Sequence, residues 1–263
     1  MSFIAPSRPD IPAEAPMLKK LIFATVILAV LGLGIWLIRD IDKFLFAYAP
    51  WALLEAFILG AAVGLTRSIL RRRAALWGAG PERHSVDSFL EHWGTASGIF
   101  MLIFSGYWIS SGGLFARNLH FLGVVVTLFF GGYFLADFIV SRKYNSLLPE
   151  GRDITGGTLG KYFFRGYWIE TGKYLSSQKA AFLVFAVIGS ELLFTGLIKT
   201  LAFFKSVPPD LLKITTSIHD IVGGFFVVML FVHIALVIAV RAHRPLLGSW
   251  LSGEAGEVTR DRA

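Results

Sequence analysis

One apolar stretch, residues 214–240, constrains this chain more than any other part of it. It reads ITTSIHDIVGGFFVVMLFVHIALVIAV and is long enough to cross a bilayer as a helix, which needs about 20 residues. It carries two histidines, His219 and His233, fourteen residues apart. Fourteen residues rise roughly 21 Å along a helix and rotate it by about 1400°, which is about 40° short of four turns. Both imidazoles therefore leave one face of the helix, at two depths in the membrane.

The composition places the whole chain in a membrane. Only 16% of its 263 residues are charged and 55% are hydrophobic, whereas soluble domains are about 25% charged. There is no cysteine, which excludes disulfides, iron–sulfur clusters and covalently attached haem on this chain. The net charge of +7 is typical of the Lys and Arg excess in cytoplasmic loops of membrane proteins, so it indicates lipid and no nucleic acid as a partner.

The apolar runs predict an all-α membrane protein with six transmembrane helices. The expected spans are residues 21–38, 44–70, 85–110, 114–140, 180–198 and 214–240, with Ser85 as the N-cap of the third. A turn at 110–113 separates the third span from the fourth, and residues 141–179 form the one sizeable loop. We divide the chain into a tail with two helices (1–80), a four-helix domain (81–250) and a polar C-terminal tail (251–263).

Loop charges predict the orientation of these spans. Six spans put both termini on one side of the membrane, and the segments on that side hold nineteen Lys and Arg residues. The loops on the opposite side hold six. Because cytoplasmic loops carry the excess of basic residues, both termini are expected in the cytoplasm.

Two further histidines match the depths of the first two. His92 lies near the cytoplasmic end of the third expected helix, and His120 lies near the outer end of the fourth. Depth alone therefore pairs His92 with His233 and His120 with His219. Each pair takes its members from two helices, as a bis-histidine b haem in a helix bundle requires. The hypothesis is a pair of b haems stacked across the membrane.

Small residues accompany these histidines and could open space for a flat macrocycle. They lie within about one turn of a proposed ligand: Gly94, Gly123, Gly223 and Gly224. Glycines also serve ordinary helix packing in membranes. Two other classes stay open at this point, a proton-coupled transporter that uses histidine and carboxylate relays, and a structural membrane anchor without functional haem.

Several charged residues lie within or near the expected spans. Glu55 is nearest the middle of its span and is expected in either an interhelical hydrogen bond or a proton path. Asp137 is interpreted as a solvated charge at a helix end. Lys143 is interpreted as part of the cytoplasmic basic excess, with pairing to a propionate of the cytoplasmic haem as the alternative. Asp220 points about 100° away from His219 and is expected to contact a neighbouring helix or a partner subunit.

Short motifs around the histidines resemble a known family. They are His92-Trp93 with Ser105-Gly106 downstream, RNLHFLG around His120, PEGRDI at 149–154, KYLSSQK at 173–179, and SIHDIVGG followed by FVHIAL. They resemble the cytochrome b (gamma) subunit of respiratory formate dehydrogenases and, more distantly, hydrogenase cytochrome b subunits. The resemblance covers roughly residues 83–250 and implies a four-helix dihaem core, so the first two spans are additional to it.

The resemblance implies a function and a set of site residues. It implies two b haems on the four paired histidines, and electron transfer across a bacterial inner membrane between an extramembrane partner and the quinone pool. Substrate chemistry would belong to partner subunits, iron–sulfur and catalytic. A menaquinone or ubiquinone site is implied beside the cytoplasmic haem, with Lys173, Tyr174, Gln178 and Lys179 matching the family segment. The family's asparagine is Leu175 here, which removes one polar group from that pocket.

Overall fold

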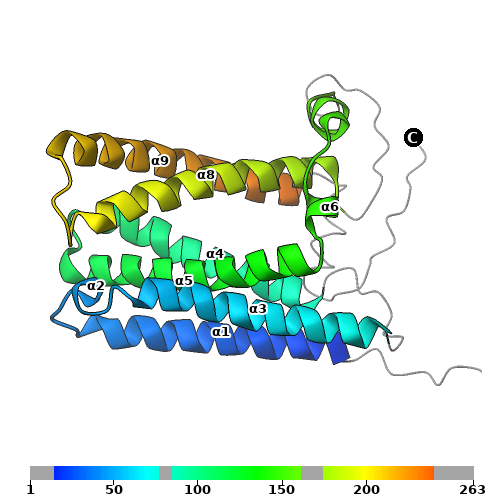
Figure 1. The fold of residues 1–263 in the computed structure, drawn as a ribbon, viewed down its shortest axis with the longest axis horizontal. Coiled ribbons are helices and arrows are strands. Elements are labelled where there is room, and N and C mark those ends of the chain that lie inside the picture. The colour runs from blue at the N-terminus through cyan, green and yellow to red at the C-terminus, as the bar shows by residue number, and fades with distance from the viewer. Residues whose placement is uncertain (1–14, 77–84, 161–173, 240–263) are drawn as a thin grey trace, which may run out of the picture.

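The computed structural model describes residues 15–76, 85–160 and 174–239 (Figure 1). Within these ranges the regular structure is entirely helical. In chain order the elements are α1 (Ala15–Arg39), α2 (Leu45–Tyr48), α3 (Ala52–Leu76), α4 (Val86–Trp108), α5 (Gly113–Val140), α6 (Tyr144–Leu147), the π-helical segment η1 (Asp153–Gly160), α8 (Ser176–Leu201) and α9 (Pro209–Ala239). Lys173 and the two terminal tails lie outside the described residues.

Five helices of the described part are long and apolar enough to cross a membrane, namely α1, α3, α5, α8 and α9. Large apolar side chains point outward from them, among them Leu28, Val187 and Ile221, the last 72% exposed. Such surfaces suit lipid rather than water. The protein is therefore an all-helical, multi-pass membrane protein, as the sequence predicts. The third expected span, 85–110, forms α4, which is 23 residues long but has Asp87 and Glu91 in its first two turns and is not one of these five.

The second expected span begins later than predicted. Residues 44–51 form the short helix α2 and a turn, and α3 starts at Ala52 rather than at residue 44. The cause is Pro50, because the residue before a proline is driven out of the helical region, and Ala49 has φ −135° and ψ 52°. Glu55 consequently lies in the first turn of α3. Its expected place near the middle of a span is wrong.

Local capping signals explain where the other helices begin. Ser85 caps α4 as predicted, with its hydroxyl accepting a hydrogen bond from the Ser88 amide at 3.3 Å. The turn between α4 and α5 ends at Gly113, whose φ of 59° lies in the left-handed region that favours glycine. Pro209 opens α9 at the first helical position, where its missing amide proton costs no hydrogen bond.

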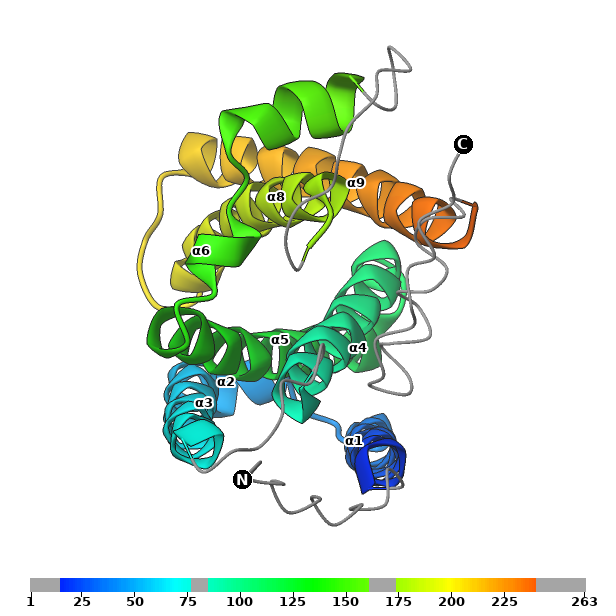
Figure 2. The same cartoon turned by 90° about the vertical axis from the view of Figure 1, so that its right-hand side faces the viewer.

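The long helices form three layers (Figures 1 and 2). The pair α8/α9 makes one outer layer, α4/α5 makes the middle layer, and α1 and α3 make the other outer layer. Backbones approach closely between α3 and α5, between α4 and α5, and between α8 and α9. The middle layer and α8/α9 make few close backbone contacts with each other. We call the space between these two pairs the interlayer gap.

Two ends of the bundle can be distinguished in Figure 1. One end holds α2, the α4–α5 turn and the α8–α9 connection, and is called the α2 end. The opposite end holds α6, the end of α3 and the start of α8, and is called the α6 end. Every loop expected outside the cytoplasm lies at the α2 end.

Candidate functional site

The four histidines singled out from the sequence lie on helices that face each other across the interlayer gap. His92 is on α4, His120 on α5, and His219 and His233 on α9. His120 and His219 lie toward the α2 end and interact electrostatically with each other. His92 and His233 lie toward the α6 end and interact in the same way. The structure therefore brings together two pairs, here called the α2-end pair (His120, His219) and the α6-end pair (His92, His233).

Each imidazole of the α2-end pair is held by a hydroxyl group from the neighbouring helix. The Ser105 hydroxyl on α4 lies 3.0 Å from Nδ1 of His120 on α5. The Thr195 hydroxyl on α8 lies 2.8 Å from Nδ1 of His219 on α9. A glycine follows each hydroxyl residue, and a Cβ at Gly106 or Gly196 would contact the adjacent imidazole at 3.8 or 3.6 Å. The two imidazoles thus have the same local surroundings on different helix pairs.

The second hydrogen bond of each hydroxyl determines the tautomer of the imidazole. Ser105 donates to the Met101 carbonyl at 2.6 Å, and Thr195 donates to the Glu191 carbonyl at 2.8 Å. A hydroxyl has a single proton, so toward the histidine it accepts, and Nδ1 carries the imidazole hydrogen. Nε2 then keeps its lone pair. Histidines that ligate metals usually have their other nitrogen fixed by such a hydrogen bond.

The α6-end pair has aromatic neighbours. The ring of His92 lies 5.3 Å from that of Trp93, and the ring of His233 lies 5.7 Å from that of Phe185 on α8, perpendicular to it. Phe185 in turn packs edge-on against Phe226 at 5.2 Å. These contacts orient the His233 ring from the α8 side.

The glycines expected to open space for a macrocycle divide into two groups. Gly94 faces the Phe130 ring, and Gly123 faces Gly98 and Leu102 of α4. Both serve the close packing of α4 against α5, so their predicted place beside the gap is wrong. On α9, a Cβ at Gly224 would meet no heavy atom within 4 Å, and one at Gly223 would meet only Leu192, at 3.9 Å. Gly223 is four residues after His219 and shares its face, so it leaves room as expected, whereas Gly224 is exposed and lies about 140° around α9 from His219.

The residues that match the quinone segment lie at the α6 end, and Lys173 falls outside the described residues. The Gln178 side-chain oxygen accepts a hydrogen bond from the Leu175 amide at 3.0 Å, which caps α8. The Lys179 ammonium lies 2.9 Å from Asp153 of η1. Burial raises the pKa of the Tyr174 phenol to about 12, and the charges of Glu91 and Asp137 act in the same direction. Tyr174 therefore lies within electrostatic range of both carboxylates.

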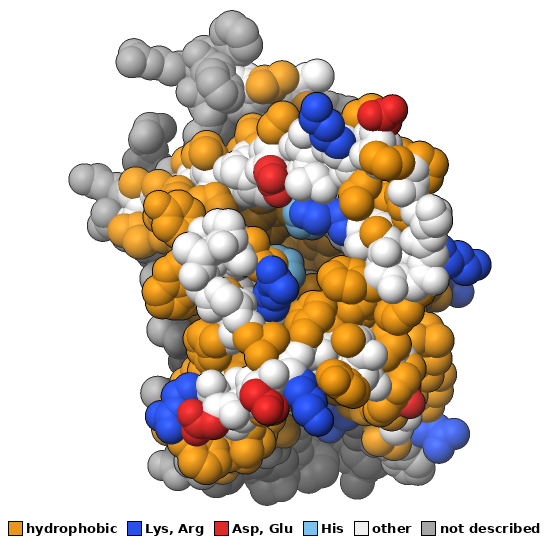
Figure 3. All heavy atoms as spheres, turned by 90° about the vertical axis from the view of Figure 1, so that its left-hand side faces the viewer, with side chains coloured by type: hydrophobic (Ala, Val, Ile, Leu, Met, Phe, Trp, Pro, Cys, Tyr) orange, Lys and Arg blue, Asp and Glu red, His pale blue; other side chains and the backbone are white. Residues whose placement is uncertain are grey.

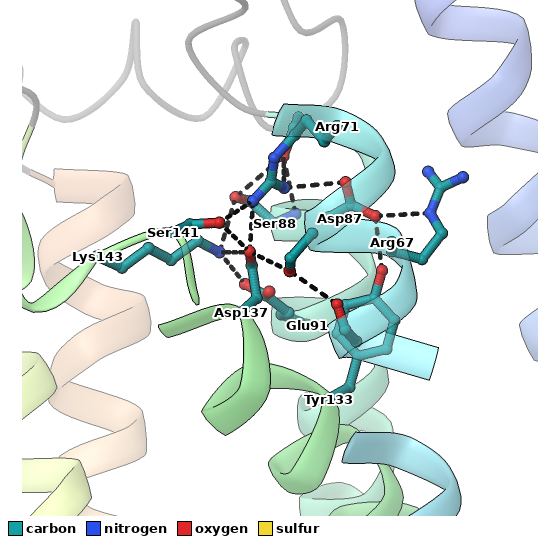
Figure 4. Close-up of polar contacts among 12 residues, drawn as sticks. Arg67, Arg71, Asp87, Ser88, Glu91, Tyr133, Asp137, Ser141 and Lys143 are labelled. Carbon is teal, nitrogen blue, oxygen red and sulfur yellow. Dashed lines mark hydrogen bonds and ion pairs between the residues drawn. The ribbon is translucent and has the colours of Figure 1, made fainter. Parts of the chain in front are cut away.

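A buried ionic network at the α6 end joins α3 to α4 and α5 (Figure 4). Arg71 of α3 forms ion pairs with Asp87 of α4 and Asp137 of α5. Arg67 reaches Asp87 at 3.0 Å, where the Tyr133 hydroxyl also donates, at 2.6 Å. Lys143 and Glu91 extend the network, which then holds three basic and three acidic side chains among the described residues.

Two interpretations from the sequence are corrected by this network. Asp137 is completely buried rather than solvated, and Lys143 binds it at 2.6 Å and Glu91 at 2.5 Å. Lys143 is therefore an ion-pair partner rather than a member of a diffuse basic surface. The sequence reasoning missed Asp87 and Glu91 because they lie near a helix start, where acidic residues are common on exposed surfaces.

Thr195 and Gly196 were also missed. The available signal was a hydroxyl residue followed by glycine, which recurs as Ser105-Gly106 on the other pair. Among the described residues, no three or more His, Cys, Asp or Glu side chains converge on one point. The histidines form pairs only.

Paired imidazoles on facing helices of a multi-pass, all-helical membrane protein define the construction of a membrane cytochrome b. A family model described as prokaryotic cytochrome b561 matches residues 83–252. The chain belongs to this family, which comprises hydrogenase-type and formate dehydrogenase-type membrane cytochrome b subunits, so the resemblance seen in the sequence is confirmed. Membership implies binding of haem b. No curated protein and no solved structure matches the chain.

The match covers α4 to α9 and leaves out α1 to α3. The arginines of the ionic network therefore come from outside the matched segment, and its carboxylates come from within it.

Proposed function

We propose that this chain is the membrane cytochrome b subunit of a respiratory oxidoreductase complex, with one b haem at each histidine pair. The observation that carries the proposal is the matched pair of hydroxyl contacts at His120 and His219. Both contacts place the hydrogen on Nδ1 and leave Nε2 as a ligand atom. His92 and His233 would hold the second haem, supported by their electrostatic interaction across the same gap.

Haem at each pair would supply a one-electron carrier at each of two depths in the membrane. The chain supplies the rest. Ser105 and Thr195 orient the imidazoles and increase the basicity of Nε2. Gly223, on the face of His219, leaves the α9 side of the gap open. The apolar helices exclude water, which strengthens every charge interaction inside the bundle.

The proposed orientation puts the α6 end in the cytoplasm of a bacterial cell, with the bundle in the inner membrane and both termini cytoplasmic. The support is the distribution of nineteen against six basic residues between the two sides. The four-helix unit of residues 81–250 would carry the haems. The α2 end would then receive electrons from the iron–sulfur and catalytic subunits of the complex.

We place the quinone site, for menaquinone or ubiquinone, beside the α6-end pair. Its support is the segment around Tyr174, whose phenol lies within range of Glu91 and Asp137. The Gln178 oxygen is used in capping α8, so its amide nitrogen is the group proposed to meet the quinone. Lys173 completes the proposed set from the family segment.

Single histidine replacements test this proposal on the purified chain. Reduced-minus-oxidised spectra should show b-type haem in the wild type. His120→Ala and His219→Ala should each remove the same haem, and His92→Ala and His233→Ala should each remove the other. Loss of different haems by His120→Ala and His219→Ala would contradict the pairing. A wild-type chain with no b-type spectrum would instead favour a transporter or a structural anchor.

A further inference from the structure

The short helix α2 contacts both histidine-bearing layers, α4/α5 and α8/α9, at the α2 end of the bundle. Its Phe46 is 4% exposed, and the centroid of its ring lies 5.8 Å from that of Phe121 on α5. The same ring lies 5.4 Å from the rings of Phe203 and Phe204, which follow the end of α8. Phe44 lies 5.6 Å from Phe203, and we call these five residues the aromatic bridge.

Asn118 of α5 holds α2 in this position. Its side chain is completely buried, accepts a hydrogen bond from the Leu45 amide at 2.9 Å and donates one to the Lys43 carbonyl at 2.9 Å. At about 100° per residue, Asn118 lies about 160° around α5 from His120, and Phe121 lies about 100° from it. The contacts of α2 therefore pass round one side of α5, from its back toward the face that carries His120.

The aromatic bridge has a counterpart at the α6 end. There Phe182 of α8 lies 5.9 Å from Phe134 and 6.0 Å from Phe138 of α5, so the two layers contact each other directly. At the α2 end, rings from both layers contact Phe46 instead. Figure 3 views this end and shows histidine side chains at the floor of a depression. A residue from outside the family-matched segment thus has the place that Phe182 has at the other end.

We propose that α2 fixes the separation of the two layers at the α2-end pair, with Phe46 as the positioning residue. The inference rests on the proposed function, since it needs His120 and His219 to ligate one haem. Both imidazoles then have to stay within bonding distance of a single iron, although the backbones of their layers make few close contacts. Truncation of the Phe46 side chain leaves a cavity among the rings of the bridge, so the layers can shift relative to each other.

Carbon monoxide binding by the reduced, full-length chain tests this inference. A haem with two histidine ligands has no open position for carbon monoxide, so both haems of the wild type should be unreactive. In Phe46→Ala, the α2-end haem should bind carbon monoxide and the α6-end haem should not. Phe46→Leu should stay unreactive, since it keeps most of the apolar volume. Tyr48→Ala is the matched control, because it removes a 65% exposed ring from the same helix.

Three results would overturn the positioning role of Phe46. They are two unreactive haems in Phe46→Ala, even with a lowered melting temperature, equal reaction of both haems in that variant, and carbon monoxide binding by Tyr48→Ala. Loss of the α2-end haem alone from Phe46→Ala, with both haems kept in Phe46→Leu, supports the inference. The α2-end haem is assigned by its loss in His219→Ala.

A second variant decides the question if Phe46→Ala retains neither haem. Phe203→Ala opens the aromatic bridge from a side chain that is 63% exposed, so it leaves the buried part of the bundle intact. Carbon monoxide binding at the α2-end haem alone supports the inference, and two unreactive haems overturn it. A wild-type chain that lacks haem, or that itself binds carbon monoxide, would contradict the proposed function instead.

Discussion

Ser105 and Thr195 each connect a helix carbonyl to an imidazole through one hydroxyl group. Serine and threonine often bond the carbonyl four residues back in a helix, as Ser97 and Ser190 do here. Ser105 and Thr195 differ from these residues because their hydroxyl oxygen also accepts a hydrogen bond from a histidine of the neighbouring helix. Side-chain chemistry that is common in membrane helices thereby fixes the tautomer of two proposed ligands.

Removing these hydroxyls should weaken haem binding at the α2-end pair only. In Ser105→Ala and Thr195→Val, the imidazole loses the partner of its Nδ1 hydrogen, so we expect haem affinity there to fall about 10- to 100-fold. Haem retention under competition with a haem-binding apoprotein measures the change. Ser97→Ala and Ser190→Ala are the controls, and a loss of equal size in them would contradict the orienting role.

Asp153 should make the contact between η1 and α8 dependent on pH. Burial tends to raise the pKa of this carboxyl, but hydrogen bonds from the Glu150 amide, Lys179 and Ser176 outweigh it and hold the pKa below the ordinary 3.8. A lowered folded-state pKa adds stability that is present above 3.8 and is lost as the pH falls through the folded value. Hydrogen exchange at the start of α8 should therefore increase only below pH 3.8.

Asp153→Asn should remove that pH dependence and show fast exchange at neutral pH as well. Glu150→Gln is the control, because its carboxylate pairs with exposed Arg152 instead. Unaltered exchange in Asp153→Asn would mean that the carboxylate does not hold η1 against α8.

At the residue scale, the sequence predicts the position of a side chain where that position depends only on the helix that carries it. The depths of His92, His120, His219 and His233 follow from helix geometry, and so does the cap at Ser85. Thr195 could not be found in the same way, because its contact with His219 depends on how α8 rotates against α9. The pairing of Asp137 was missed for the same reason, since its partners Arg71 and Lys143 come from other elements.

Among the helices, α3 packs closely against α5, backbone to backbone, rather than standing apart as a separate anchor. Gly60 and Gly64 form a small-xxx-small pattern, and a Cβ on either would overlap the carbonyl of Phe129 or Tyr133 on α5. A Cβ at Gly132 of α5 would likewise overlap the Phe57 carbonyl. Such close approach of backbones is how helices associate in lipid, where the hydrophobic effect does not act between them.

Gly60→Ala should separate α3 from α5. The added methyl has only backbone to displace, so we expect a loss of about 1–3 kcal/mol in unfolding free energy. Melting of the detergent-solubilised protein measures it. Gly32→Ala on α1 is the control, because a Cβ there meets no heavy atom within 4 Å. Equal melting temperatures for the two variants would show that the α3–α5 contact is looser than described.

Arg71→Met should destabilise the protein through the carboxylates that it leaves behind. Asp137 is fully buried and Asp87 is 3% exposed, and removing one partner from a buried ionic cluster costs about 3–5 kcal/mol. Unfolding by denaturant in detergent measures the loss. Arg72→Met is the control, since Arg72 is an exposed neighbour on the same turn. Adding Asp137→Asn to Arg71→Met should recover part of the loss, and no recovery would contradict the electrostatic cause.

At the scale of elements, the length of each apolar run predicts most of the spans, in the order in which they occur along the chain. The exceptions are at Pro50, which divides the expected second span into α2 and α3, and in α4, whose polar first turns make its apolar run shorter than those of its neighbours. Pro50 and the acidic residues of α4 are visible in the sequence. The long apolar runs around them nevertheless favour uninterrupted spans.

For the whole molecule, the segment that the family model matches and the helices before it form one structure. The family-matched segment supplies the four histidines, and the preceding helices supply close packing and the arginines of the ionic network. The sequence predicts the helices before and within the matched segment, and the two histidine depths. It does not predict how α3 packs against α4 and α5. Close approach between α3 and α5, and ion pairs between α3 and α4, arise only when the helices assemble. The interlayer gap likewise depends on this assembly, since α8/α9 stand apart from α4/α5.

The most direct test of the central proposal is the number of haems bound per chain. Pyridine haemochromogen analysis of the purified, full-length chain, combined with quantitative amino-acid analysis, gives this ratio without assuming a partner or a substrate. Two histidine pairs predict two b haems per chain, falling to one in His219→Ala and to one in His92→Ala. A ratio of one or zero in the wild type would contradict the account.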